Sequence, residues 1–194
     1  MAFAFANGIA MIRHLPNILT MLRLFAAPVI AGFLWQGHYA LALGVFVFAG
    51  LSDAADGFLA KRYGFDTPFG VYFDPVADKL LMLVSFIVLT AIGASPLWLA
   101  ILVIARDCVI VGAIALARFL VLPLKITPSL LGKASTAFQV GYIGILLIML
   151  AFNIEAPRAV EIAAFTVGVM TLASWLSYAQ VWLRAFFAGK SRAA

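Results

Sequence analysis

The sequence has 194 residues, of which 65% are apolar and only 11% are charged. An average soluble domain has about 45–50% apolar and about 25% charged residues, so this composition excludes an ordinary soluble domain and a disordered chain. The net charge of +5 comes from basic residues scattered along the chain, which excludes a nucleic-acid-binding stripe and favours contact with anionic lipid headgroups.

The chain divides into a short N-terminal segment and six longer apolar segments. Residues 1–12 are apolar but lack the charged start and the cleavage pattern of a secretory signal, so we expect a short interfacial helix there. Because a membrane crossing needs about 20 residues, we predict an all-α, polytopic membrane protein, a bundle of six transmembrane helices in a single domain over 1–194. The predicted spans are 18–35, 39–60, 70–92, 97–119, 131–152 and 159–187.

The basic residues indicate the orientation in the membrane. The gaps at 36–38 and 93–96 contain no Lys or Arg, and the gap between the last two spans has only Arg158 beside two glutamates. By the positive-inside rule both termini are expected to be cytoplasmic, and we expect a bacterial inner membrane. The basic residues at the cytoplasmic ends are Arg13, Arg23, Lys61, Arg62, Arg118, Lys125, Lys133, Arg184, Lys190 and Arg192.

Acidic residues concentrate where the second and third spans join. Five of the eight acidic residues lie there, and four of them form two pairs spaced by three or four positions, so each pair shares one helix face. Aspartates close together in a membrane repel one another and need cations. Oxygen ligands of this kind suit Mg²⁺ or Mn²⁺, so the pattern predicts a site for one or two divalent ions. The five residues are Asp53, Asp56, Asp66, Asp74 and Asp78.

Two other interpretations of these aspartates are open. They can cap helices at the membrane interface and pair with nearby basic residues such as Lys61, Arg62 and Lys79. Intramembrane carboxylates also mark ion-coupled transporters. The absence of comparable acids in the other spans and of an inverted repeat disfavours a transporter.

The segment from Asp53 to Lys61, followed after eight residues by Gly70 and then by Asp74 and Asp78, carries a long motif. It resembles the signature of the CDP-alcohol phosphatidyltransferases, DxxDGxxAR, eight residues, GxxxDxxxD. Lys61 stands at the position of the arginine, and Arg62 follows it. The resemblance implies a membrane enzyme that transfers the phosphatidyl group of CDP-diacylglycerol to an alcohol, releases CMP, uses two divalent ions and forms a homodimer.

The resemblance also implies roles for individual residues. Asp78 is the expected general base, accepting the proton of the acceptor hydroxyl. The expected metal ligands are Asp53, Asp56, Asp74 and Asp78. The expected CDP contacts are Asn17, Thr20, Arg23, Asp56, Gly57, Ala60, Lys61, Arg62 and Gly70. Open alternatives are close helix packing at Gly57 and Ala60, a helix cap at Asn17, and an Arg23 side chain that extends to the membrane surface.

Arg106 and Asp107 lie inside the fourth predicted span, where an unpaired arginine is costly. Charges at this depth imply an anionic ligand, and we expect these two residues, with Arg118 and Lys133, to bind the acceptor. Arg106 can instead pair with a carboxylate of the aspartate cluster, and Lys133 can be an ordinary positive-inside residue.

The acceptor is inferred from position 114 and from two segments that resemble those of one branch of the family. Phosphatidylglycerophosphate synthases of the family carry an arginine two turns after the position of Arg106, and here that position is Ile114. The run 128–139 and the pair of Arg106 with Asp107 look more like the CDP-diacylglycerol-dependent cardiolipin synthases. We therefore expect phosphatidylglycerol as the acceptor, with glycerol 3-phosphate as the alternative.

Overall fold

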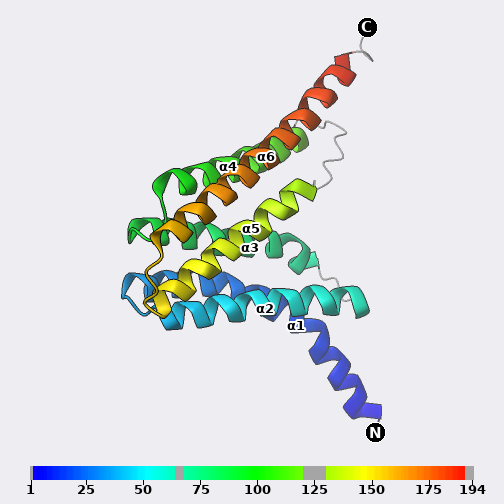
Figure 1. Ribbon diagram of the computed structural model, residues 1–194. Coiled ribbons are helices and arrows are strands. Elements are labelled where there is room, and N and C mark those ends of the chain that lie inside the picture. The colour runs from blue at the N-terminus through cyan, green and yellow to red at the C-terminus, as the bar shows by residue number, and fades with distance from the viewer. Residues whose placement is uncertain (1, 64–67, 120–129, 191–194) are drawn as a thin grey trace. The chain divides into compact units, whose positions relative to one another are not determined.

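The regular structure of the chain is helical. The computed structural model describes the backbone of residues 2–63, 68–119 and 130–190, and the side chains of 18–55, 76–112 and 130–180. All regular elements in these ranges are α-helices, which confirms the predicted all-α class and the six predicted helices. In chain order, coloured from blue to red in Figure 1, they are α1 (Ala2–Trp35), α2 (Tyr39–Tyr63), α3 (Pro68–Ala91), α4 (Leu97–Phe119), α5 (Leu130–Ala151) and α6 (Pro157–Lys190).

Three helices contain a segment that is long and apolar enough to cross a membrane. These segments are Ile18–Trp35 in α1, Leu130–Ala151 in α5 and Pro157–Gln180 in α6, and α2 adds a shorter apolar stretch, Tyr39–Ala55. These segments are assigned only among the residues whose side chains are described, and parts of α2, α3 and α4 lie outside that set. The prediction of six spans therefore stays a prediction.

The N-terminal segment continues into the first span as one helix. Helix α1 has 34 residues, and its apolar segment begins only at Ile18. At 1.5 Å per residue it is about 51 Å long, against about 30 Å for the hydrocarbon core of a bilayer. Part of α1 therefore extends beyond the hydrocarbon core if the helix crosses without a steep tilt, and the interfacial position of residues 1–12 stays a prediction.

The helices form two compact units, and the first is built around α1. Unit 1 comprises Met1–Ile92 and Leu147–Ile154, and unit 2 comprises Gly93–Leu146 and Glu155–Ala194. In unit 1, α1 packs against both α2 and α3. Buried residues recur every three or four positions on each helix, as one packed face requires: Ala27, Ile30 and Leu34 on α1, Ala42, Phe46 and Ala49 on α2, and Ala77, Leu81, Ser85 and Leu89 on α3.

In unit 2, α4 packs against α6. The approach is close at Gly168, where an added Cβ would lie 2.9 Å from Cζ3 of Trp98. The Trp98 ring also packs against Phe165, with ring centroids 5.4 Å apart. A residue without a side chain at position 168 thus lets α6 approach the indole of α4.

Two helices of the chain end in tight, well-defined caps. At the end of α1, His38 N donates to Phe33 O at 2.8 Å and Gly37 takes a φ of 78°. At the end of α5, Ile154 N donates to Met149 O at 2.8 Å and Asn153 takes a φ of 52°. Both are Schellman caps, which require a left-handed residue and favour glycine or asparagine there.

Candidate active site

A buried arginine joins two aspartates of the predicted cluster. Arg23 of α1 donates from Nη1 to Oδ1 of Asp53 in α2 and to Oδ1 of Asp78 in α3, both at 2.6 Å. The Arg23 side chain is 1% exposed, whereas the side chains of Asp53 and Asp78 are 53% and 47% exposed. Aspartates from the two helices therefore converge on one cationic nitrogen, and each keeps part of its carboxylate open to a ligand.

The helix packing of unit 1 brings these three residues together. Arg23 continues the buried face of α1, which contacts both other helices. Asp53 lies one turn after the buried Ala49 of α2, and Asp78 directly follows the buried Ala77 of α3. Each carboxylate thus stands at the edge of a packed face, next to the arginine.

The N-terminal element contributes from inside the unit. Thr20 and Arg23 are both 1% exposed and lie about one turn apart on α1. The Arg23 side chain is therefore buried next to the carboxylates. The alternative that it extends to the membrane surface is wrong. Asn17 lies in α1 beyond the described side chains, so its predicted contact stays a prediction.

The donor set of this cluster fits a divalent cation. One arginine against Asp53 and Asp78 leaves a formal charge of −1, and carboxylate oxygens are the ligands that Mg²⁺ and Mn²⁺ prefer. Asp56 and Asp74 are helical residues one turn from these two, but their side chains are outside the described set. No group of three or more ligands gathers among the described side chains, so the two-metal site stays a prediction.

The other CDP contacts predicted from the sequence lie on α2 and α3, the helices of Asp53 and Asp78. The structure does not describe side chains at these positions. Helical spacing nevertheless puts Asp53, Gly57 and Ala60 on one stripe of α2. The residues concerned are Gly57, Ala60, Lys61 and Arg62 in α2 and Gly70 in α3.

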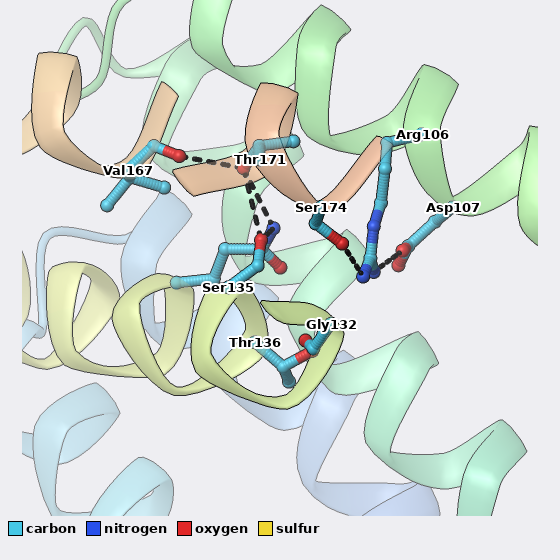
Figure 2. A network of polar contacts seen from close by, with 9 residues as sticks. Arg106, Asp107, Gly132, Ser135, Thr136, Val167, Thr171 and Ser174 are labelled. Carbon is cyan, nitrogen blue, oxygen red and sulfur yellow. Dashed lines mark hydrogen bonds and ion pairs between the residues drawn. The ribbon is translucent and has the colours of Figure 1, made fainter. Parts of the chain in front are cut away.

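A second buried arginine lies in unit 2. Arg106 of α4 donates from Nη1 to Oδ1 of Asp107 at 2.7 Å and from Nη2 to Oγ of Ser174 in α6 at 2.9 Å. Figure 2 shows the end of the Arg106 side chain between Asp107 and Ser174. The Cζ atom lies 5.9 Å from the ring centroid of Tyr178, a distance that allows a cation–π interaction. Arg106 and Asp107, both predicted to bind the acceptor, therefore form an ion pair with each other.

A buried polar contact between α5 and α6 lies one turn before Ser174. Gln139 of α5 donates from Nε2 to Oγ1 of Thr171 at 3.3 Å and to Oγ of Ser135 at 3.4 Å. All three side chains belong to residues that are at most 2% exposed. Gln139 therefore joins α5 to α6, and the hydroxyl of Thr136 bonds the carbonyl of Gly132 in its own helix (Figure 2).

The remaining acceptor residues are only partly placed. Lys133 is exposed on α5, and Arg118 lies in α4 beyond the described side chains. Sequence reasoning missed Ser174 and Tyr178, which contact Arg106 from α6. Their signal was the row of polar residues at positions 171, 174 and 178, which share one face of an otherwise apolar helix.

The sequence matches one family model and several known phospholipid synthases. The family model for CDP-alcohol phosphatidyltransferase matches residues 13–187. A cardiolipin synthase (CMP-forming) / mitochondrial hydrolase fusion protein of Schizosaccharomyces pombe is 32% identical over 84% of the chain and 30% of its own length. A probable cardiolipin synthase (CMP-forming) of Drosophila melanogaster is 32% identical over 86% of the chain and 57% of its own length. A probable phosphatidylglycerophosphate synthase of Mycobacterium tuberculosis is 37% identical over 81% of the chain and 77% of its own length.

Proposed function

Because the chain belongs to the CDP-alcohol phosphatidyltransferase family, we propose that it transfers the phosphatidyl group of CDP-diacylglycerol to phosphatidylglycerol, giving cardiolipin and CMP. Members of this family are transferases and generally use divalent metal ions. The observation that carries the proposal is the convergence of Asp53 and Asp78 on Arg23, because both aspartates belong to the signature motif.

In the proposed reaction, a hydroxyl oxygen of phosphatidylglycerol attacks the phosphatidyl phosphorus of CDP-diacylglycerol. A new P–O bond forms, the P–O bond to CMP breaks, and CMP leaves with the electron pair. Asp78 accepts the hydroxyl proton, a role that its half-exposed carboxylate supports. Arg23 orients Asp78 and Asp53 toward one point.

Two divalent ions, Mg²⁺ or Mn²⁺, are proposed to complete this site. Their ligands would be Asp53, Asp56, Asp74 and Asp78, and the ions would supply charge neutralisation at the pyrophosphate and at the leaving CMP. CDP is proposed to lie along the small-residue stripe of α2, in contact with Thr20 and Arg23 of α1 and with the other residues predicted from the sequence.

Arg106 is proposed to bind the phosphate of the acceptor, together with Asp107, Arg118 and Lys133. A phosphate diester within a lipid needs fewer cationic contacts than a phosphate monoester does. Ile114, in place of a further arginine, supports the diester. The names of the relatives from Schizosaccharomyces pombe and Drosophila melanogaster support the same acceptor.

A second candidate is phosphatidylglycerophosphate synthesis, in which glycerol 3-phosphate is the acceptor. The relative from Mycobacterium tuberculosis favours it, because the chain covers 77% of that protein at 37% identity. The first two relatives are matched over only 30% and 57% of their own length. Both candidates share the donor and the aspartate motif.

The three apolar helices and the family indicate an integral membrane protein. We propose six spans in a bacterial inner membrane, with the site and both termini on the cytoplasmic side, and a homodimer. We also propose that residues 1–194 act as one transferase domain. The family match supports this, since residues 13–187 include helices of both units.

The deciding experiment measures CMP release by the purified protein in lipid micelles that contain CDP-diacylglycerol and Mg²⁺ or Mn²⁺. Release that requires phosphatidylglycerol and stops with a chelator is the expected result. Release with glycerol 3-phosphate alone would keep the donor chemistry and replace the acceptor. Absence of release with either acceptor would contradict the proposed function.

A further inference from the structure

The Nε–H of the Arg106 guanidinium is a buried donor that the described protein groups do not use. Nη1 is committed to Asp107 and Nη2 to Ser174. Nε is fully buried, and among the described residues it has no hydrogen-bond partner. A buried donor left without an acceptor is costly, so this N–H is placed to donate to a ligand.

Helix α6 determines how that donor is oriented. The Ser174 hydroxyl accepts the Nη2 proton at 2.9 Å, and the Tyr178 ring lies beneath the guanidinium at 5.9 Å from Cζ. These two residues are about one turn apart and follow Thr171 on the same face. Thr171 is itself bonded to Gln139 of α5, so the rotation of α6 about its own axis is fixed at this level.

We propose that Ser174 and Tyr178 are positioning residues that hold the Arg106 guanidinium with its Nε–H directed at a phosphate oxygen of the acceptor. Ser174 is 0% exposed, and its hydroxyl bonds Arg106, so it acts through Arg106 and does not itself bind the ligand. The ligand class is a phosphate ester, either the diester of a phospholipid or the monoester of glycerol 3-phosphate. This inference rests on the proposed function, because it assumes that the Arg106 site receives the acceptor.

The test compares KM for the acceptor with KM for CDP-diacylglycerol in the purified full-length chain. Ser174→Ala is expected to raise the acceptor KM about tenfold, because a hydrogen bond to a charged group is lost, and to leave the donor KM unchanged. Ser174→Thr, which keeps the hydroxyl, is expected to restore most of the loss. Running each variant with phosphatidylglycerol and with glycerol 3-phosphate distinguishes a diester from a monoester.

Tyr178 provides an independent pair of variants in case Ser174→Ala does not fold. Tyr178→Leu removes the ring and is expected to raise the acceptor KM about fivefold, whereas Tyr178→Phe keeps the ring face and recovers the affinity. Thr166→Ala is the matched control for Ser174→Ala, because it also removes a hydroxyl from α6, but one that is exposed and bonds only the carbonyl of Ile162 in its own helix. Equal losses for Tyr178→Phe and Tyr178→Leu would overturn the role of the ring.

Two outcomes separate this inference from the proposed function. If the unsubstituted chain is active and Ser174→Ala changes neither KM, or both KM values equally, the positioning role is wrong and the proposed function stands. If the unsubstituted chain releases no CMP with either acceptor, the proposed function fails and the positioning role fails with it.

Discussion

Among the residues whose side chains the structure describes, each unit buries one arginine, and the two arginines differ in their partners. Arg23 of unit 1 bonds two carboxylates, those of Asp53 and Asp78, and both are about half exposed. Arg106 of unit 2 bonds one carboxylate, that of Asp107, and one hydroxyl, that of Ser174. The Arg23 group has a formal charge of −1, and the Arg106 group is formally neutral.

This difference assigns opposite ligand charges to the two arginines. Extra negative charge around Arg23 attracts a cation, and Asp56 and Asp74 on the same helices add to that charge. A formally neutral ion pair, as at Arg106, does not attract a cation, and its guanidinium suits an oxygen acceptor such as a phosphate ester. Metal and donor chemistry are thus expected at Arg23 and acceptor recognition at Arg106, and the following predictions test that assignment.

The largest effect is expected from Asp78→Asn. The amide keeps the shape of the side chain but cannot accept the hydroxyl proton, so the rate of CMP release should fall by about 10²–10⁴-fold. The measurement is CMP release at saturating donor, acceptor and Mg²⁺.

Glu161→Gln is the matched control for Asp78→Asn, because Glu161 is an exposed acid on α6. Its CMP release should equal that of the unsubstituted chain. The general-base role of Asp78 would be refuted by an Asp78→Asn variant that stays folded and retains full activity.

The next effect separates the two arginines directly. Arg106→Gln should lower kcat/KM for the acceptor by about 10–100-fold, the cost of losing charged hydrogen bonds, and leave the donor KM near its original value. Arg23→Gln should instead raise the KM for CDP-diacylglycerol and the Mg²⁺ concentration needed for half-maximal rate. Initial rates over a grid of donor, acceptor and metal concentrations measure both.

If Arg106→Gln and Arg23→Gln changed the same kinetic parameter, the two arginines would not have separate roles. Arg106→Lys tests which property of the arginine is needed, because lysine keeps the charge but not the planar set of donors. Partial recovery with lysine would assign the role of Arg106 to charge, and no recovery would assign it to the geometry of the guanidinium.

Sequence patterns predicted the helices and the convergence of the aspartates, but missed which side chains of other helices bond the two arginines. The six apolar segments predicted the helices, and the spacing of the aspartates predicted the convergence of Asp53 with Asp78. Arg23 is 30 and 55 residues from its two partners, and Ser174 is 68 residues from Arg106. Helical periodicity carries no information over such separations, because packing alone decides which faces meet.

The start of the first helix shows a second limit of the sequence. Residues 1–12 were expected as a separate interfacial helix, but α1 runs from Ala2 to Trp35 without interruption in its helical backbone. Pro16 did not end the helix. The apolar segment of α1 begins only at Ile18, inside the continuous helix. The difference in composition between the two parts of α1 therefore indicates a change of environment and not a break in the backbone.

A smaller effect is expected from Ile114→Arg, which adds a cation two turns after Arg106 on α4. The change should raise kcat/KM for glycerol 3-phosphate relative to phosphatidylglycerol by about tenfold, because a phosphate monoester carries more charge than a diester. Ile114→Lys is the control, because lysine adds the charge without the planar set of donors of arginine. An unchanged ratio of the two acceptors would remove position 114 as a determinant of specificity.

The smallest effect concerns the packing that holds the Arg106 site. Gly168→Ala brings a Cβ to 2.9 Å from the Trp98 ring, which is also packed on Phe165, so the contact between α4 and α6 must shift. Gly141→Ala on α5 is the matched control, because nothing lies within 4 Å of a Cβ at that position. The two variants share the gain in helix propensity, so their difference isolates the steric cost, about 1–3 kcal/mol.

That cost corresponds to a Tm lower by about 2–10 °C for Gly168→Ala than for Gly141→Ala, measured by thermal unfolding in detergent. Because Gly168 and Ser174 lie on the same helix, the acceptor KM of Gly168→Ala should rise slightly. The donor KM, which depends on the Arg23 group of unit 1, should not change. Equal Tm values for the two variants would mean that Trp98 moves aside freely, and a raised donor KM would mean that the two arginine groups are coupled.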